Sequence, residues 1–246
     1  MSNKVALVTG GARRVGAAIS RRLHERGMSL MVHYRQSAGE AQALQAELNA
    51  ARPDSVALVQ ADLLNMAALP ALVAQTLERF GRLDVLVNNA SSFFPTPIGR
   101  ISEREWEDLI GTNLKTPLFL SQAAALPLRR SQGCIVNIVD IHADRPMHNY
   151  VVYSVAKGGL LALTRSLASE LGPEVRVNGV SPGIIMWPED AQWSDEVGRQ
   201  RLIQTTLLKR IGDPDDIATT VRFLVFDAPY VTGQIIAVDG GRSLHL

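Results

Sequence analysis

The fold is decided by Val5-Ala6-Leu7-Val8-Thr9-Gly10-Gly11-Ala12-Arg13-Arg14-Val15-Gly16, where a short apolar run leads directly into a glycine-rich turn. A helical pattern follows at about 14–26, so the stretch is predicted to form a strand, a tight turn and a helix. Glycines allow close approach to the backbone of such a turn, and the helix N-terminus offers free N–H groups to a pyrophosphate. The stretch predicts a dinucleotide site, although an ordinary glycine-rich connection would have a similar composition.

Apolar runs and amphipathic stretches alternate along the rest of the chain. Strands are predicted at 4–9, 29–34, 55–60, 83–87, 133–139, 174–179 and 234–238, and helices at 14–26, 38–51, 66–80, 103–130, 153–171 and 214–226. Strands separated by helices imply βαβ crossovers and a parallel sheet that is covered on both faces. We therefore expect one doubly wound α/β domain over residues 1–246.

One long irregular region is predicted at 182–200, and we expect a substrate flap near 182–208. Long loops in compact domains are usually functional, but a plain surface connection is the alternative. Trp187 and Trp193 either shape this flap or pack against a neighbouring subunit.

The composition excludes several functional classes. The 246 residues include 25 basic and 24 acidic side chains, so no global charge points to nucleic acid or an anionic membrane. A single cysteine, Cys134, cannot form an intramolecular disulfide. The N-terminus does not resemble a signal peptide, and no apolar run approaches roughly 18 residues. We expect a cytoplasmic protein, and we expect no metal site at His142, Asp144 and His148.

The end of the second predicted strand indicates which cofactor the site prefers. NAD-specific sites usually place an acidic residue there, but the sequence continues with Arg35-Gln36-Ser37, and the next carboxylate is Glu40 in the following helix. Arg35 and Ser37 suit a 2′-phosphate, which predicts NADPH/NADP+, unless Arg35 is only a solvated loop residue. Asp62 is predicted either to accept from the adenine amine or to cap a turn.

Tyr153 and Lys157 are spaced to share one face of a helix. A phenol has a pKa near 10, and a nearby ammonium group would lower that pKa toward the working range of a proton shuttle. Such a pair is common and usually structural, so it indicates a catalytic site only in combination with the other motifs.

Together, the motifs resemble the short-chain dehydrogenase/reductase family over essentially the whole chain, which implies a Rossmann-type fold. The resemblance is carried by Thr9–Gly16, Asn88-Asn89-Ala90, Tyr153 with Lys157, Pro182-Gly183 on the nicotinamide side, and Asp239-Gly240-Gly241. It implies that Asn113 is catalytic and holds a water that connects to the lysine. It also implies that helices 103–130 and 153–171 form the interfaces of a homotetramer.

Three departures from the family pattern resemble the pteridine reductases. Arg14 replaces the middle glycine of the turn, Ser91 replaces a glycine after Asn-Asn-Ala, and Asp140 stands where a catalytic serine is expected. The segments 88–97 and 33–37 also resemble that subgroup. This resemblance implies NADPH-dependent reduction of a dihydropterin, with dihydrofolate or oxidised pterin as further substrates.

The resemblance and the residue chemistry together give a set of candidate site residues. Catalysis is assigned to Asp140, Tyr153, Lys157 and Asn113, with Asp140 and Tyr153 as a proton-donating pair. Substrate binding is assigned to Arg14, Ser91, Phe93, Asp140 and Tyr153. Cofactor binding is assigned to Gly10, Arg13, Arg14, Val15, Gly16, His33, Tyr34, Arg35, Ser37, Asp62, Leu63, Asn89, Ala90, Tyr153, Lys157, Pro182 and Gly183.

Alternatives remain open for some of these residues and for the function. Phe93 is predicted to stack on the pterin, whereas a core position is the alternative for Phe93 and the preferred one for Phe94. Asp140 is alternatively a buried cap of a backbone N–H. A 3-oxoacyl thioester reductase is the competing activity, but it predicts serine at 140 and glycine at 14 and 91. A non-catalytic NADPH-sensing module is the remaining alternative, and it predicts a broken Tyr/Lys pair.

Overall fold

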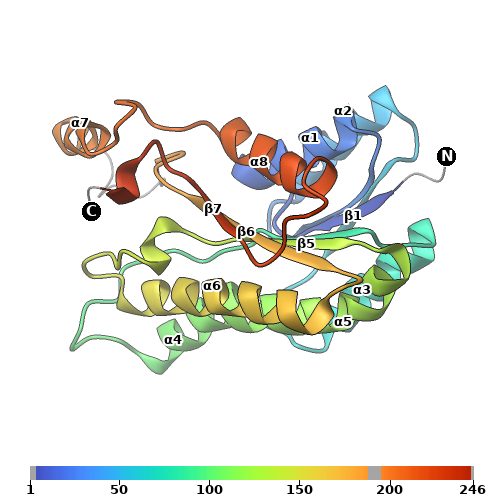
Figure 1. Cartoon of the computed structure of the whole chain (residues 1–246), viewed down its shortest axis with the longest axis horizontal. Coiled ribbons are helices and arrows are strands. Elements are labelled where there is room, and N and C mark those ends of the chain that lie inside the picture. Colours follow the sequence, from blue (N-terminus) through green and yellow to red (C-terminus); the bar gives the residue numbers. More distant parts are fainter. Residues whose placement is uncertain (1–3, 188–194, 245–246) are drawn as a thin grey trace.

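Seven parallel strands form the central sheet of the computed structural model, which describes residues 4–187 and 195–244 (Figure 1). Their order across the sheet is β3-β2-β1-β4-β5-β6-β7. The strands are β1 (Val5–Val8), β2 (Ser29–Tyr34), β3 (Val56–Gln60), β4 (Val85–Asn88), β5 (Cys134–Ile138), β6 (Arg176–Pro182) and β7 (Ile235–Val238). The doubly wound parallel sheet predicted from the sequence is confirmed.

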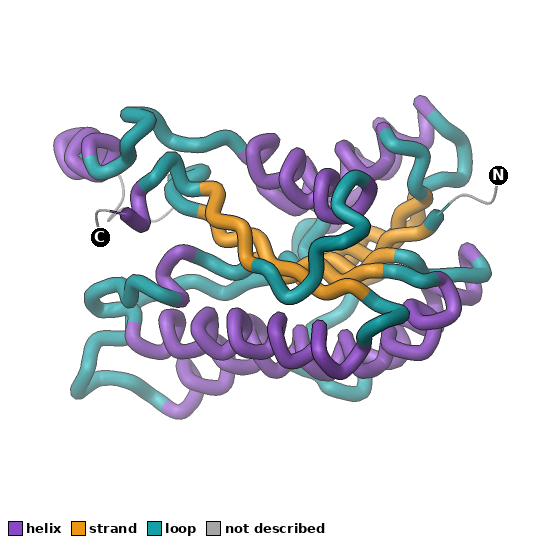
Figure 2. The backbone as a smooth tube through the Cα atoms, viewed as in Figure 1, coloured by secondary structure: helices purple, strands orange, loops and turns teal. Residues whose placement is uncertain are grey.

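Helices cover both faces of this sheet, so the strands lie in the middle of three layers (Figure 2). One face carries α1 (Arg14–Glu25), α2 (Ala38–Ala51) and α8 (Pro214–Phe226). On the other side lie α3 (Ala68–Phe80), α4 (Glu103–Ile110), α5 (Thr116–Ser131) and α6 (Val151–Leu171). Among the described residues, no helix is long and apolar enough to cross a lipid bilayer.

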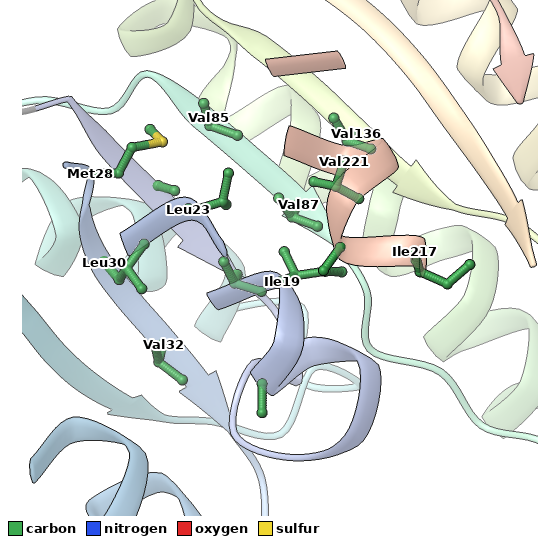
Figure 3. Packing of buried hydrophobic residues seen from close by; sticks show 14 of the residues in the cluster. Ile19, Leu23, Met28, Leu30, Val32, Val85, Val87, Val136, Ile217 and Val221 are labelled. Atoms are coloured by element: carbon green, nitrogen blue, oxygen red, sulfur yellow. The ribbon is translucent and has the colours of Figure 1, made fainter. Parts of the chain in front are cut away.

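The core follows from alternation along strands that are buried on both faces. Ala6 and Val8 of β1 belong to the cluster under α1 and α8, whereas Leu7 belongs to the cluster on the opposite face. Figure 3 shows part of the first cluster, to which Ile19 of α1 and Val221 of α8 both contribute. Burying apolar side chains on both faces keeps the strand ends fixed, and these ends carry the site.

The strand order reverses between β1 and β4, and this reversal determines where a ligand can enter. From β1 the chain proceeds to β2 and β3 on one side, and it then returns to β4 on the other. The loops after β1 and β4 therefore diverge and leave a crevice at the carboxyl ends of the strands, the usual ligand position in such sheets.

The structure corrects two expectations about helices. The helix predicted at 103–130 is interrupted by a π-helical turn, η1 (Gly111–Lys115), between α4 and α5. The region expected to be irregular as far as 200 contains α7 (Glu196–Gln204), whose N-terminus is capped by the Asp195 carboxylate. This helix buries no residue, and its sequence therefore lacks the apolar stripe by which helices are predicted. Trp193 and the rest of 188–194 lie outside the described residues.

Candidate active site

The turn after β1 is shaped for close approach of a ligand to the backbone. A Cβ on Gly16 would lie 2.1 Å from the Gly10 carbonyl oxygen, so only glycine fits there. Arg14 has φ +53°, in the left-handed region that favours glycine, and it occupies the position at which the family pattern has one. The first turn of α1 has no acidic residue and no side-chain cap, so its N–H groups are available to an anion.

His33 supports this turn from the neighbouring strand. Its Nδ1 accepts from the Gly10 backbone N–H at 3.1 Å, and its Nε2 lies 3.1 Å from the Ala61 carbonyl oxygen. These partners define a neutral ring that is protonated on Nε2. Burial lowers the pKa of His33, in agreement with that state. His33 lines the predicted cofactor site, but both of its ring nitrogens already have partners, one in the turn after β1 and the other directly after β3.

The ends of β1 and β4 are joined by side chains of the two motifs. Thr9 Oγ1 accepts from the backbone N–H groups of Asn89 and Ala90 at 2.9 and 3.1 Å. The Asn89 amide donates to the carbonyl oxygens of Thr9 and Gly10 at 2.9 and 3.0 Å. Asn89 therefore fixes the first glycine of the turn.

The end of β2 carries the groups expected to select the cofactor. Arg35 is exposed, and its carbonyl oxygen accepts from the Gln60 amide at 2.9 Å. Ser37 is the N-cap residue of α2, and its hydroxyl makes no capping bond. The carboxylate of Asp62 accepts from the Leu64 backbone N–H at 3.0 Å. Asp62 therefore caps a turn, which is one of the two roles predicted for it.

Tyr153 and Asp140 form a direct hydrogen bond at the centre of the site. Tyr153 Oη donates to Asp140 Oδ2 at 2.7 Å, while Asp140 Oδ1 accepts from the His142 backbone N–H at 2.8 Å. Asp140 therefore caps the short helix η2 (Ile141–Ala143) and also accepts from the phenol, so the geometry agrees with the predicted cap and brings together the predicted Asp140–Tyr153 pair.

The pKa of Tyr153 depends on burial and on Asp140. Burial and the neighbouring Asp140 carboxylate raise the pKa of Tyr153 well above 10. Lys157 Nζ donates to the Ile138 carbonyl oxygen at 2.9 Å and lies 5.7 Å from the centre of the Tyr153 ring. Burial lowers the pKa of Lys157 to about 8. The phenol is thus held in its protonated form, because the carboxylate is bonded to it and the ammonium is not.

Asn113 lies behind the wall of the site, in the π-helical turn. Its Oδ1 accepts from the Ser91 hydroxyl at 2.6 Å. Its Nδ2 donates to the carbonyl oxygens of Ser92 and Leu109, both at 2.9 Å. Asn113 is almost completely buried and does not line the cavity, so the structure supports a positioning role toward Ser91. π-Helical turns are frequent at functional sites.

Phe93 packs in an aromatic cluster and also lines the cavity, so it has features of both the core position and the site position predicted for it. Its ring stacks on Tyr150, with centroids 4.6 Å apart and planes 17° apart, and it meets Tyr153 edge-on at 4.8 Å. It is half-buried and lines the cavity, as does Phe94. One side of Phe93 therefore belongs to the aromatic cluster, and the ring still contributes to the cavity wall.

A single cavity of about 780 Å³ brings the predicted site together. All the proposed cofactor, substrate and catalytic residues line it except Asn113. Ile184, Trp187 and Leu202, from the region predicted as a substrate flap, also line it, whereas sequence reasoning missed Thr112 and Arg242. Arg242 follows the Asp239-Gly240-Gly241 motif directly, and this position could have indicated it. Within the described part of the chain, no three His, Cys, Asp or Glu side chains are grouped to hold a metal ion.

Comparison with known proteins identifies the class. The chain matches the family model described as enoyl-(acyl carrier protein) reductase over residues 10–243. With the fold and the Tyr153–Lys157 pair, this match shows that the chain belongs to the short-chain dehydrogenase/reductase family and is an oxidoreductase.

Two kinds of relative are about equally similar to the chain. Pteridine reductase 1 of Leishmania tarentolae is 39% identical, with 98% of this chain and 96% of the relative covered. A 3-oxoacyl-[acyl-carrier-protein] reductase of Staphylococcus aureus is 38% identical, with 98% of each chain covered. A reductase of the same name from Synechocystis is 37% identical, with 99% of this chain and 98% of the relative covered. Overall identity therefore does not distinguish the two substrate classes.

Proposed function

We propose that the protein is an NADPH-dependent pteridine reductase that converts a dihydropterin to a tetrahydropterin, with dihydrofolate and oxidised pterin as further substrates. The observation that carries this assignment is the hydrogen bond from Tyr153 Oη to the Asp140 carboxylate. A 3-oxoacyl thioester reductase would reduce a ketone, whose oxygen becomes negative as hydride arrives. A carboxylate beside that oxygen would repel the developing charge, whereas a C=N bond needs only a proton on its nitrogen.

The surroundings of the cavity fit the cofactor. The glycine cradle and the uncapped N-terminus of α1 suit a pyrophosphate, and Arg35 with Ser37 suits a 2′-phosphate. Lys157 would bind the nicotinamide ribose, and Pro182 with Gly183 would face the nicotinamide. When bound, the reduced nicotinamide supplies the hydride.

The chain's own groups would supply the proton. Tyr153 Oη would donate to the pterin nitrogen as hydride adds to the carbon of the same C=N bond, which leaves one new C–H and one new N–H bond. The proton taken from the phenol is replaced from solvent. The Asp140 carboxylate would orient the phenol and receive the incoming proton, directly or through water. Phe93 would stack on the pterin, and Arg14 and Ser91 would contact its polar edge.

Two other functions predict different outcomes. A 3-oxoacyl thioester reductase is favoured by the identity with the bacterial reductases, and a non-catalytic NADPH-binding module would need no acid at all. NADPH oxidation should be measured with a neutral dihydropterin, dihydrofolate and acetoacetyl-coenzyme A. We expect the dihydropterin to give the highest kcat/KM. A higher kcat/KM for the thioester would reverse the assignment, and the absence of any turnover while NADPH still binds would favour the module.

The assembly proposed with this function is a homotetramer in the cytoplasm. Exposed apolar side chains lie on α5 and α6, namely Leu118, Phe119, Leu126, Val151 and Val155. Such side chains are typical of helices that pack against a second copy. Light scattering after gel filtration should give four times the chain mass, and replacement of Leu126 and Val155 by aspartate should reduce it.

A further inference from the structure

Arg242 is a buried cation in the wall of the catalytic cavity. It begins the short helix η4 (Arg242–Leu244), which follows the turn after β7. Only 8% of its surface is exposed, yet it lines the same cavity as Asp140 and Tyr153. No role for it follows from the motif analysis or from the mechanism above.

The Nε atom of Arg242 lacks a hydrogen-bond partner among residues 4–187 and 195–244. It is buried, and the carboxylates of Asp140 and Asp239 act on the guanidinium group only as neighbouring charges. The neighbouring Asp239 carboxylate is already used, because it accepts from the backbone N–H groups of Gly241 and Ser243 at 2.9 and 2.7 Å. Burial lowers the pKa of Arg242, while the negative charges of Asp140 and Asp239 act against that shift.

A buried N–H group without an acceptor is costly, since its lost hydration is not replaced. Such a group becomes stable when a ligand brings an oxygen acceptor to it. The phosphates of a dinucleotide are a poor explanation. Their sites follow β1 and β2, whereas η4 follows β7 at the opposite edge of the sheet.

We propose that Arg242 is a substrate-binding residue whose guanidinium donates to a carbonyl or carboxylate oxygen of the substrate beside Asp140, an inference that rests on the proposed function. A neutral dihydropterin offers a ring carbonyl oxygen, and dihydrofolate adds two carboxylates. Asp140 and Arg242 would then present a negative and a positive group to the same ligand, which favours heterocycles that carry both donors and acceptors.

Arg242→Met removes the donors at similar volume, Arg242→Lys keeps the charge, and Arg130→Met on the exposed end of α5 is the matched control. Initial rates should be measured with a neutral dihydropterin and with dihydrofolate, together with calorimetric binding of each to the NADP+-loaded protein. We expect Arg242→Met to raise KM and Kd at least tenfold, with kcat changed less than threefold and the KM for NADPH unchanged. Arg242→Lys should recover part of the affinity, and Arg130→Met should match the wild type.

The two substrates distinguish the sources of the oxygen. If Arg242→Met weakens the binding of both substrates, the acceptor of Arg242 is the ring carbonyl oxygen. If it weakens the binding of dihydrofolate alone, the acceptor is a carboxylate. Unchanged KM and Kd for both substrates would overturn the proposal, as would a fall in kcat without a change in KM. If Arg242→Met does not fold, equal KM values for Arg242→Lys and the wild type would overturn it as well.

The same measurements separate this inference from the proposed function. Turnover of dihydropterin by the wild type tests the function, whereas the ratio of variant to wild type tests Arg242. If the wild type reduces only acetoacetyl-coenzyme A, the function has failed. The comparison of variants is then made with that thioester, whose carbonyl oxygens offer the same acceptor chemistry. A tenfold rise in KM would still support an oxygen-binding role for Arg242, and an unchanged KM would exclude it.

Discussion

The Gly10 backbone N–H donates to His33 Nδ1 at 3.1 Å, so the cofactor turn depends on a neutral imidazole in the adjacent strand. Burial holds the pKa of His33 below its ordinary value of 6.5, whereas an unfolded chain would bind the proton near that value. As the pH falls below about 6.5, the unfolded state gains protons that the folded state does not.

We therefore expect the free energy of unfolding to decrease as the pH falls below about 6.5. Urea denaturation between pH 5 and 8 measures this dependence. His33→Gln should reduce the slope, while His148→Gln, at an exposed histidine, should not change it. Part of the slope will remain in His33→Gln, because burial also lowers the pKa of His24. An identical slope in His33→Gln and wild type would contradict the expectation.

Cofactor preference depends on Arg35 and Ser37. Charge-assisted hydrogen bonds to a phosphate are worth about 1.5–3 kcal/mol each. NADPH should exceed NADH at least about tenfold in kcat/KM, and Arg35→Asp should remove much of that difference by repelling the phosphate. Arg79→Asp, at an exposed arginine on α3, serves as the charge-matched control. Equal use of both cofactors by the wild type would refute the prediction.

Phe93→Ala should affect both binding and folding, because the ring lines the cavity and also stacks on Tyr150. Aromatic pairs contribute about 0.5–1.5 kcal/mol beyond area burial. We expect weaker pterin binding, a moderate decrease in Tm and an unchanged Kd for NADPH, measured by calorimetry and thermal unfolding. Phe93→Leu should retain most of the stability but not the pterin affinity. A normal pterin Kd in Phe93→Leu would make Phe93 a core residue only.

Replacement of Asp140 tests the proton-donating pair. General acid catalysis contributes about 10²–10⁴-fold, so Asp140→Ser should lose at least about a hundredfold in kcat/KM for dihydropterin. NADPH binding should be retained, and the dependence of kcat/KM on pH should change. Wild-type turnover with an unchanged profile would exclude the role. A gain in ketone reduction would indicate an ordinary carbonyl reductase.

At alkaline pH, the dependence of kcat/KM on pH should reflect deprotonation of Lys157. Burial lowers the pKa of this lysine to about 8, so its positive charge is lost as the pH rises through that value. Without the charge, proton release from Tyr153 becomes harder, and kcat/KM should decrease with a midpoint near pH 8. Asp140→Ser should move this alkaline limb to lower pH, because the negative charge of Asp140 raises the pKa of Lys157 against the effect of burial. A flat rate up to pH 9.5 would contradict the assignment.

Local sequence was sufficient to predict the site wherever a single motif lies at the end of a single strand. The pattern around Val5–Gly16 predicted both the first βα unit and the position of the cradle, since glycine is required there by sterics alone. Tyr153 and Asp140 were paired correctly because their strand and helix are fixed by the fold class.

What the sequence did not reveal depends on tertiary contacts. Nothing in 103–130 indicates a π-helical turn, because the extra residue is accommodated by bonds from Asn113 to Ser91 and Ser92 in a distant loop. The relative influence of Asp140 and Lys157 on Tyr153 could not be predicted for a similar reason. The spacing to Lys157 was visible in the sequence, but the bond from Lys157 to Ile138 was not.

The π-helical turn also limits how this site could be transferred to another protein. A π-helical turn holds one residue more than an α-helical turn, so deletion of one residue within 111–115 would restore regular winding and remove the turn that carries Asn113. Asn113 would then leave Ser91, although every catalytic side chain would still be encoded. A designer who copied Asp140, Tyr153 and Lys157 onto a relative with an uninterrupted helix would transplant the chemistry without the backbone that aligns it.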